Sequence, residues 1–130
     1  MSAAMPINEA FGWVWVLAGF LSGLVLGLFF RRDDWLGGYG SFRRRLVRLG
    51  HISFLGLGIL NILFTLSTAR IHLAPATLIL ASRALIVGGV SMPLCCGLMA
   101  WRRGFHLLFG IPVASLVLGV ALVVRGILAP

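Results

Sequence analysis

The stretch AFGWVWVLAGFLSGLVLGLFF, residues 10–30, decides the fold class of this chain. It contains no charged side chain, and it reaches the length of about 20 residues that an α-helix needs to cross a membrane. The charged residues RRDD at positions 31–34 end it. The run is too long for the apolar part of a signal peptide, and no basic residue precedes it. We therefore expect it to be retained as a membrane-spanning helix.

Three further apolar segments follow this one along the chain, and short connections join them. Connections of this length leave no room for a soluble domain, and they favour antiparallel neighbours. We predict an all-α integral membrane protein, a four-transmembrane-helix up-down-up-down bundle with no soluble domain. Residues 1–130 would form a single membrane domain, with helices at about 10–30, 46–68, 76–100 and 107–124.

The composition supports a membrane protein and excludes a soluble one. Hydrophobic residues make up 60% of the chain and charged residues 11%, whereas soluble domains average about 45–50% and about 25%. The net charge of +8 comes from eleven arginines, and these cluster between the apolar segments. That arrangement is typical of membrane topology signals, so we expect the lipid bilayer as a partner and no nucleic acid.

The arginines also predict the orientation of the chain. Two of the connections and the residues next to them hold eight arginines: Arg31, Arg32, Arg43, Arg44, Arg45, Arg48, Arg102 and Arg103. The opposite side holds Arg70 and Arg125. Because the arginine-rich side of a membrane protein faces the cytoplasm, both termini should lie outside. We expect a multi-pass protein of the bacterial inner (cytoplasmic) membrane.

Three glycines in the first segment are candidates for close helix packing. Gly19, Gly23 and Gly27 recur every four residues and so lie on one helix face. Small residues on one face let helices approach closely in lipid. The contact would lie within the bundle or with a partner chain.

The second segment has a polar seam. Its members alternate at steps of three and four residues, which keeps them on one face. They are His51, Phe54, Gly58, Asn61, Thr65 and Thr68. The seam is either a buried packing surface or the lining of a crevice for a ligand or cofactor.

Arg83 is the one charge well inside a spanning segment, about 10 Å from its boundary at 1.5 Å per residue. Asn61 lies at a matching depth, and Glu9 is the acidic side chain on the same side. We expect Arg83, Asn61 and Glu9 to form a polar cluster. It would be a structural cluster or a binding site for an anionic headgroup or a quinone.

A second group of polar residues lies near the opposite membrane boundary. It consists of His51, His106, Cys95 and Cys96. Histidine pairs ligate haem iron, and histidine with cysteine ligates zinc or copper. No metal-ligand spacing motif accompanies these residues. A metal or haem site here is therefore a hypothesis beside that of an ordinary interfacial histidine and buried thiols.

No catalytic or nucleotide-binding motif is present in the sequence, and we expect no catalytic activity of its own. The leading interpretation is a small accessory or scaffolding subunit of a larger bacterial membrane complex, such as an energy-converting one. It would act by helix–helix association with a membrane protein partner or as a homo-oligomer. One alternative is a haem- or quinone-binding redox membrane protein that uses His51 and His106. Another is a small transporter with Arg83 as its anion site. No cofactor is favoured.

Overall fold

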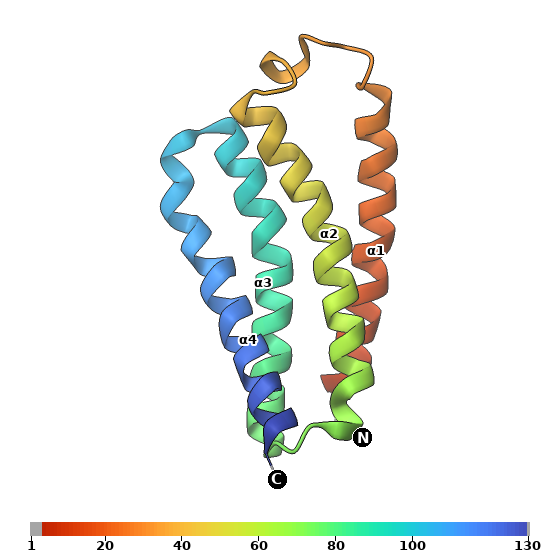
Figure 1. Ribbon diagram of the computed structural model, residues 1–130, viewed down its shortest axis with the longest axis vertical. Helices are drawn as coiled ribbons and strands as arrows, with labels where there is room; N and C mark the ends of the chain where they lie inside the picture. Colours follow the sequence, from red (N-terminus) through yellow and green to blue (C-terminus); the bar gives the residue numbers. More distant parts are fainter. Residues whose placement is uncertain (1–3, 130) are drawn as a thin grey trace.

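All regular secondary structure over residues 4–129, the part that the computed structural model describes, is helical, and side chains are described from residue 6 onward. The α-helices are α1 (Ala4–Leu28), α2 (Phe42–Ser67), α3 (Pro75–Trp101) and α4 (Gly110–Leu128) (Figure 1). The short 3-10 helices are η1 (Trp35–Gly37), η2 (Thr68–Arg70) and η3 (Arg103–Phe109). Four helical stretches in this part of the chain are long and apolar enough to span a membrane. This confirms the prediction of an all-α chain with four such helices.

α1 begins at Ala4, about six residues earlier than the apolar pattern indicated. Pro6 falls in its first turn, where the missing backbone N–H costs no hydrogen bond. Asn8 and Glu9 therefore belong to the helix, not to the segment before it. This earlier start places Asn8 where it can reach the other helices.

α2 begins at Phe42 rather than near residue 46. Ser41 is its N-cap, and the Ser41 hydroxyl accepts a hydrogen bond from the backbone N–H of Arg44 at 3.1 Å. The same hydroxyl donates to the Leu36 carbonyl at 2.6 Å, which ties the α1–α2 connection to the helix. The arginines at 43–45 are good helix formers and extend the first turns.

The helices pack mainly on their neighbours in the chain, α1 on α2, α2 on α3 and α3 on α4. α1 also reaches α3 over a shorter stretch. α1 and α4 lie on opposite sides of the molecule (Figure 1). The start of α1 and the end of α4 lie at one end, and the α1–α2 connection and η3 lie at the other (Figure 1).

The main apolar core lies where α2, α3 and the α2–α3 connection meet. Its buried members are Phe64, Ile71, Leu78, Ala81 and Leu85. Partly buried leucines of α2, of the connection and of α4 pack against it, together with a valine of α4. The backbone N–H of His72 donates to the Gly126 carbonyl at 2.9 Å and fixes the connection to α4. The main apolar core thus lies toward the end with both termini.

Candidate functional site

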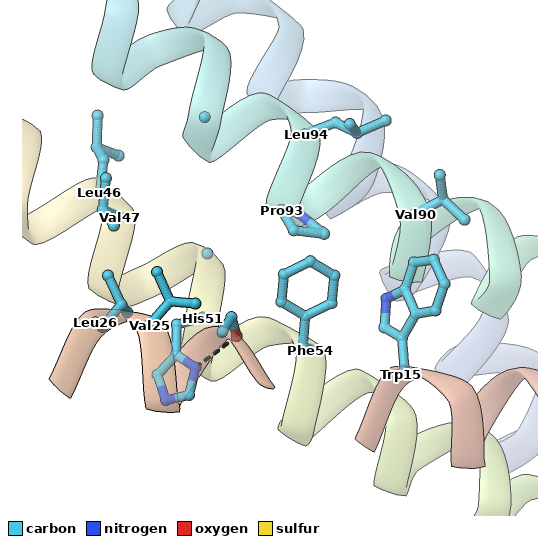
Figure 2. Close-up of a pocket in the computed structure, with 13 residues that line it drawn as sticks. Trp15, Val25, Leu26, Leu46, Val47, His51, Phe54, Val90, Pro93 and Leu94 are labelled. Atoms are coloured by element: carbon cyan, nitrogen blue, oxygen red, sulfur yellow. Dashed lines mark hydrogen bonds between the residues drawn. The ribbon is translucent and has the colours of Figure 1, made fainter. Parts of the chain in front are cut away.

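A groove of about 610 Å³ lies between α1, α2 and α3, toward the end that carries the α1–α2 connection (Figure 2). Along α1 it extends from Trp15 to Leu26, and its walls are almost entirely apolar. The rings of Trp15 and Phe54 are directed toward α3 (Figure 2). His51 is the one ionisable side chain that lines it.

His51 is held by a hydrogen bond to α1. Its Nδ1 lies 2.9 Å from the Ser22 hydroxyl (Figure 2), which also lies 3.0 Å from the Gly19 carbonyl. A hydroxyl has one proton, and a carbonyl can only accept. Both contacts are hydrogen bonds only if Ser22 donates to Gly19 and the Nδ1–H of His51 donates to Ser22. In the neutral ring, Nε2 then carries the lone pair and is an acceptor.

Trp15 compensates for a proline in α3. Pro93 has no N–H, so the carbonyl of Gly89, four residues earlier, loses its helical partner. The indole Nε1–H of Trp15 donates to this carbonyl at 2.9 Å. The ring also packs edge-on against Phe54, with ring centroids 5.7 Å apart. One side chain therefore satisfies the backbone of α3 and closes one end of the groove.

A buried polar cluster joins α1, α2 and α3. The Asn8 amide donates to Asn61 Oδ1 at 2.7 Å and to the Ser82 carbonyl at 3.3 Å. The Ser82 hydroxyl donates to Asn8 Oδ1 in a short hydrogen bond. The Asn61 amide donates to the Leu57 carbonyl at 2.9 Å. Asn8 and Asn61 are fully buried, so this network fixes the three helices against one another.

The expected cluster of Arg83, Asn61 and Glu9 is not what forms around Asn61. Arg83 and Glu9 are exposed, and no hydrogen bond or ion pair connects either of them to Asn61 in residues 4–129. The interhelical partner of Asn61 is Asn8, and Asn8 in turn bonds Ser82. Asn8 and Ser82 each lie one position before an expected residue. Successive side chains on a helix differ by about 100° in direction. An error of one residue in predicting which side chain points inward therefore selects an exposed residue instead of a buried one.

Glycines bring α1 and α2 into close contact. A Cβ built on Gly58 would lie 2.8 Å from the Gly12 carbonyl oxygen. A Cβ on Gly19 would lie 2.6 Å from Leu55 Cγ, and one on Gly23 would lie 2.8 Å from His51 Cε1. A Cβ on Gly27 would meet nothing within 4 Å. Gly27 therefore does not belong to this contact, because α1 and α2 have separated at that level.

The structure does not bring His51, His106, Cys95 and Cys96 together. His51 faces α1, whereas His106 is exposed on η3, with its Nδ1 3.3 Å from the Arg103 carbonyl. Cys95 and Cys96 are buried free thiols, and the Cys95 Sγ lies 3.4 Å from the Leu108 carbonyl oxygen. Among the described residues, no three His, Cys, Asp or Glu side chains lie where they could hold a metal ion together. The geometry gives no support to joint ligation of a metal or haem by these four residues.

The sequence interpretation missed Asn8, Ser82 and Trp15 as interhelical contacts. One available signal was that Asn8 and Asn61 are the two asparagines of the chain, and asparagine side chains in spanning segments seek polar partners. Another was Pro93, which leaves the carbonyl of Gly89 without its helical partner, so that a donor such as tryptophan is needed.

Comparisons of the chain with protein-family models, with curated proteins and with solved structures gave no match.

Proposed function

We propose that this protein crosses the bacterial inner membrane four times, as one up-down-up-down domain without a soluble domain. The α1–α2 connection and η3 would face the cytoplasm, and both termini would lie outside. The support is the concentration of arginines around those two connections, which lie at one end of the molecule.

We further propose that the groove binds a lipid-soluble ligand of the quinone class. The observation that carries this proposal is His51, an imidazole fixed by Ser22 inside an otherwise apolar groove. Its Nε2 makes no hydrogen bond to the described residues, and it is an acceptor for the hydroxyl of a reduced quinone. A ligand site of this kind is mostly apolar, with few polar groups that fix orientation.

The position of the groove suits a ligand that arrives through the bilayer. Its lining residues on α1 and α3 lie inside the candidate membrane spans Pro6–Leu28 and Pro75–Trp101. The aromatic rings of Trp15 and Phe54 offer faces on which a planar ring stacks. The tail of such a ligand would extend between α1 and α3.

The test is the quinone content of the protein extracted into polymer-bounded native membrane discs. We expect quinone to co-purify with the wild type and with His106→Leu, and to be lost from His51→Leu. His106→Leu is the matched control because it removes an exposed imidazole outside the groove. Equal quinone content in the two variants, or none in the wild type, would refute the proposal. A Soret absorption band would indicate haem in place of quinone.

The accessory or scaffolding role is the second candidate. It is favoured by α4, which packs mainly on α3 among the long helices and exposes apolar side chains such as Ile111, Val117 and Leu128. A subunit of a larger membrane complex would bury part of that face against a partner. Native mass measurement of the gently extracted protein tests this role. A heteromeric assembly that contains the chain supports it, and a monomer contradicts it.

A further inference from the structure

A second pocket lies outside the groove, at the α1–α2 connection, and is built around Arg44. The side chain of Arg44 is only 5% exposed, although it occupies the first turn of α2. Its guanidinium carbon lies 5.7 Å from the centroid of the Trp35 ring and 5.3 Å from that of Tyr39. Two aromatic faces therefore hold a permanent cation in place.

The hydrogen-bonding capacity of this guanidinium is unused. It carries five N–H donors, yet the Arg44 side chain makes no hydrogen bond and no ion pair with any described residue. The hydrogen bond that involves Arg44 comes from its backbone N–H. Buried arginines are normally paired with a carboxylate or another acceptor. No fully buried side-chain nitrogen of the described residues lacks a partner, so the unpaired donors of Arg44 are open to the space that this residue lines. A ligand in that space could accept hydrogen bonds from them.

The space beside Arg44 is large enough for such a ligand. A pocket of about 430 Å³ is lined by Arg44, Arg48 and Asp33, together with Trp35 and Tyr39. Leu26 and Phe30 form its apolar side. Arg48 stacks on the Tyr39 ring at 4.4 Å, and it donates to the Tyr39 carbonyl at 3.4 Å. Two arginines and one aspartate leave the pocket with a net positive charge.

The backbone of the connection is shaped around these rings. Leu36 adopts φ of 55°, and Gly37 and Gly38 follow with φ of 86° and 92°. Left-handed backbone at a residue such as leucine is uncommon and costs energy. Trp35 stacks on Phe29 of the preceding segment, with centroids 5.0 Å apart. The connection is thus an ordered structure that holds the aromatic rings against Arg44.

The pocket lies at the depth of lipid headgroups. The span Phe42–Arg70 contains 29 residues, about 44 Å of helix, whereas the hydrocarbon core measures about 30 Å. Arg44, two residues after its start, therefore falls in the headgroup region, where tryptophan and tyrosine are enriched. Exposed Phe30, on the apolar side of the pocket, would then lie beside the acyl chains.

From these observations we infer that the pocket binds the phosphate group of an anionic membrane lipid. Arg44 offers a planar fork to two phosphate oxygens, and Arg48 adds a second cation. The acyl chains extend along Leu26 and Phe30. This site shares Leu26 as a wall with the proposed quinone groove, but its charged groups differ, and neither proposal depends on the other.

The experiment is native mass spectrometry of the detergent-solubilised protein with phosphatidylglycerol or phosphatidylcholine of the same acyl chains. We expect the wild type to prefer phosphatidylglycerol, and Arg44→Gln to lower its affinity about tenfold, as the loss of a charge-assisted hydrogen bond implies. The matched control is Arg45→Gln. It removes the same charge from the same helical turn, but its side chain is exposed and lines neither pocket.

Two further variants separate ligand binding from folding. Arg44→Lys keeps the charge but loses the planar guanidinium that donates two parallel hydrogen bonds. This variant should bind phosphatidylglycerol with intermediate affinity. Arg48→Gln keeps Arg44 and the two aromatic rings beside it. This variant should lower the affinity for phosphatidylglycerol less than Arg44→Gln does. Equal losses in Arg44→Gln and Arg45→Gln, or no preference between the two lipids in the wild type, would overturn the inference. Competition by millimolar inorganic phosphate with no lipid preference would also overturn it, in favour of a free-phosphate site.

Discussion

The indole of Trp15 repairs the hydrogen bond that Pro93 removes from α3, and this makes it the most specific interhelical contact at the residue scale. Trp15→Phe keeps an aromatic ring but leaves the Gly89 carbonyl without a donor. We expect a loss of about 1–2 kcal/mol in the free energy of unfolding, measured by denaturant titration in mixed micelles. The control Trp13→Phe changes a side chain that is 59% exposed, and it should change stability by less than about 0.5 kcal/mol.

A double-mutant cycle identifies the cause of that loss. Pro93→Ala restores an N–H at position 93, and this N–H can donate to the Gly89 carbonyl in place of Trp15. Trp15→Phe should therefore cost less in the Pro93→Ala background than in the wild type. An unchanged cost would mean that Trp15 acts through packing with Phe11 and Phe54, and not through its hydrogen bond.

The Asn8–Asn61 pair gives the second prediction at this scale. Asn8→Leu and Asn61→Leu should each destabilise the protein by about 1 kcal/mol, the range found for interhelical hydrogen bonds in membranes. The double variant should cost less than the sum, because the two amides are direct partners. The pair Arg83→Gln and Asn61→Leu should be additive within about 0.5 kcal/mol, since these residues share no partner. Non-additivity of that pair would restore the cluster expected from the sequence.

At the scale of elements, the contact between α1 and α2 depends on Gly12 and Gly58. A methyl group on Gly58 would meet the Gly12 carbonyl oxygen, which belongs to the backbone and cannot rotate away. Gly58→Ala should therefore force the helices apart and cost about 1–3 kcal/mol of stability. Gly56→Ala is the control: a Cβ there meets nothing within 4 Å, and it should be neutral or stabilising by up to about 1 kcal/mol. Equal melting temperatures for the two variants would contradict the observed helix contact.

At the scale of the whole molecule, the orientation across the membrane is open to a direct test. Cys95 and Cys96 are first replaced by alanine, and a single cysteine is then placed at exposed His72 or exposed Gly104. These positions lie in the α2–α3 connection and in η3, at opposite ends of the molecule. An impermeant thiol reagent should label His72→Cys in intact cells, and label Gly104→Cys only after lysis. The reverse pattern would invert the orientation that the arginines predict.

The sequence predicted the helices well and the contacts between them poorly. The lengths of the apolar segments predicted four candidate spans. α1 and α2 start earlier than expected, because Pro6 is tolerated in the first turn of α1 and Ser41 caps α2, so both helices include polar residues before the apolar segments. In the groove, the seam on α2 correctly grouped His51 with Phe54, since both lie on one helix face. The residues opposite them, Trp15 and Ser22, lie on another helix and were not identified.

By itself, the sequence determined that this chain forms four helices long and apolar enough to span a membrane. Local composition suffices for that, because every backbone polar group in lipid must be satisfied within its own helix. Only the tertiary structure decided which faces of those helices meet.

The rotation of each helix about its axis depends on packing against its neighbours, and a shift of one residue turns a side chain by about 100°. That rotation buried Asn8 and Ser82 and left Glu9 and Arg83 exposed. It also opened the groove beside His51 and placed the buried Arg44 between two aromatic rings.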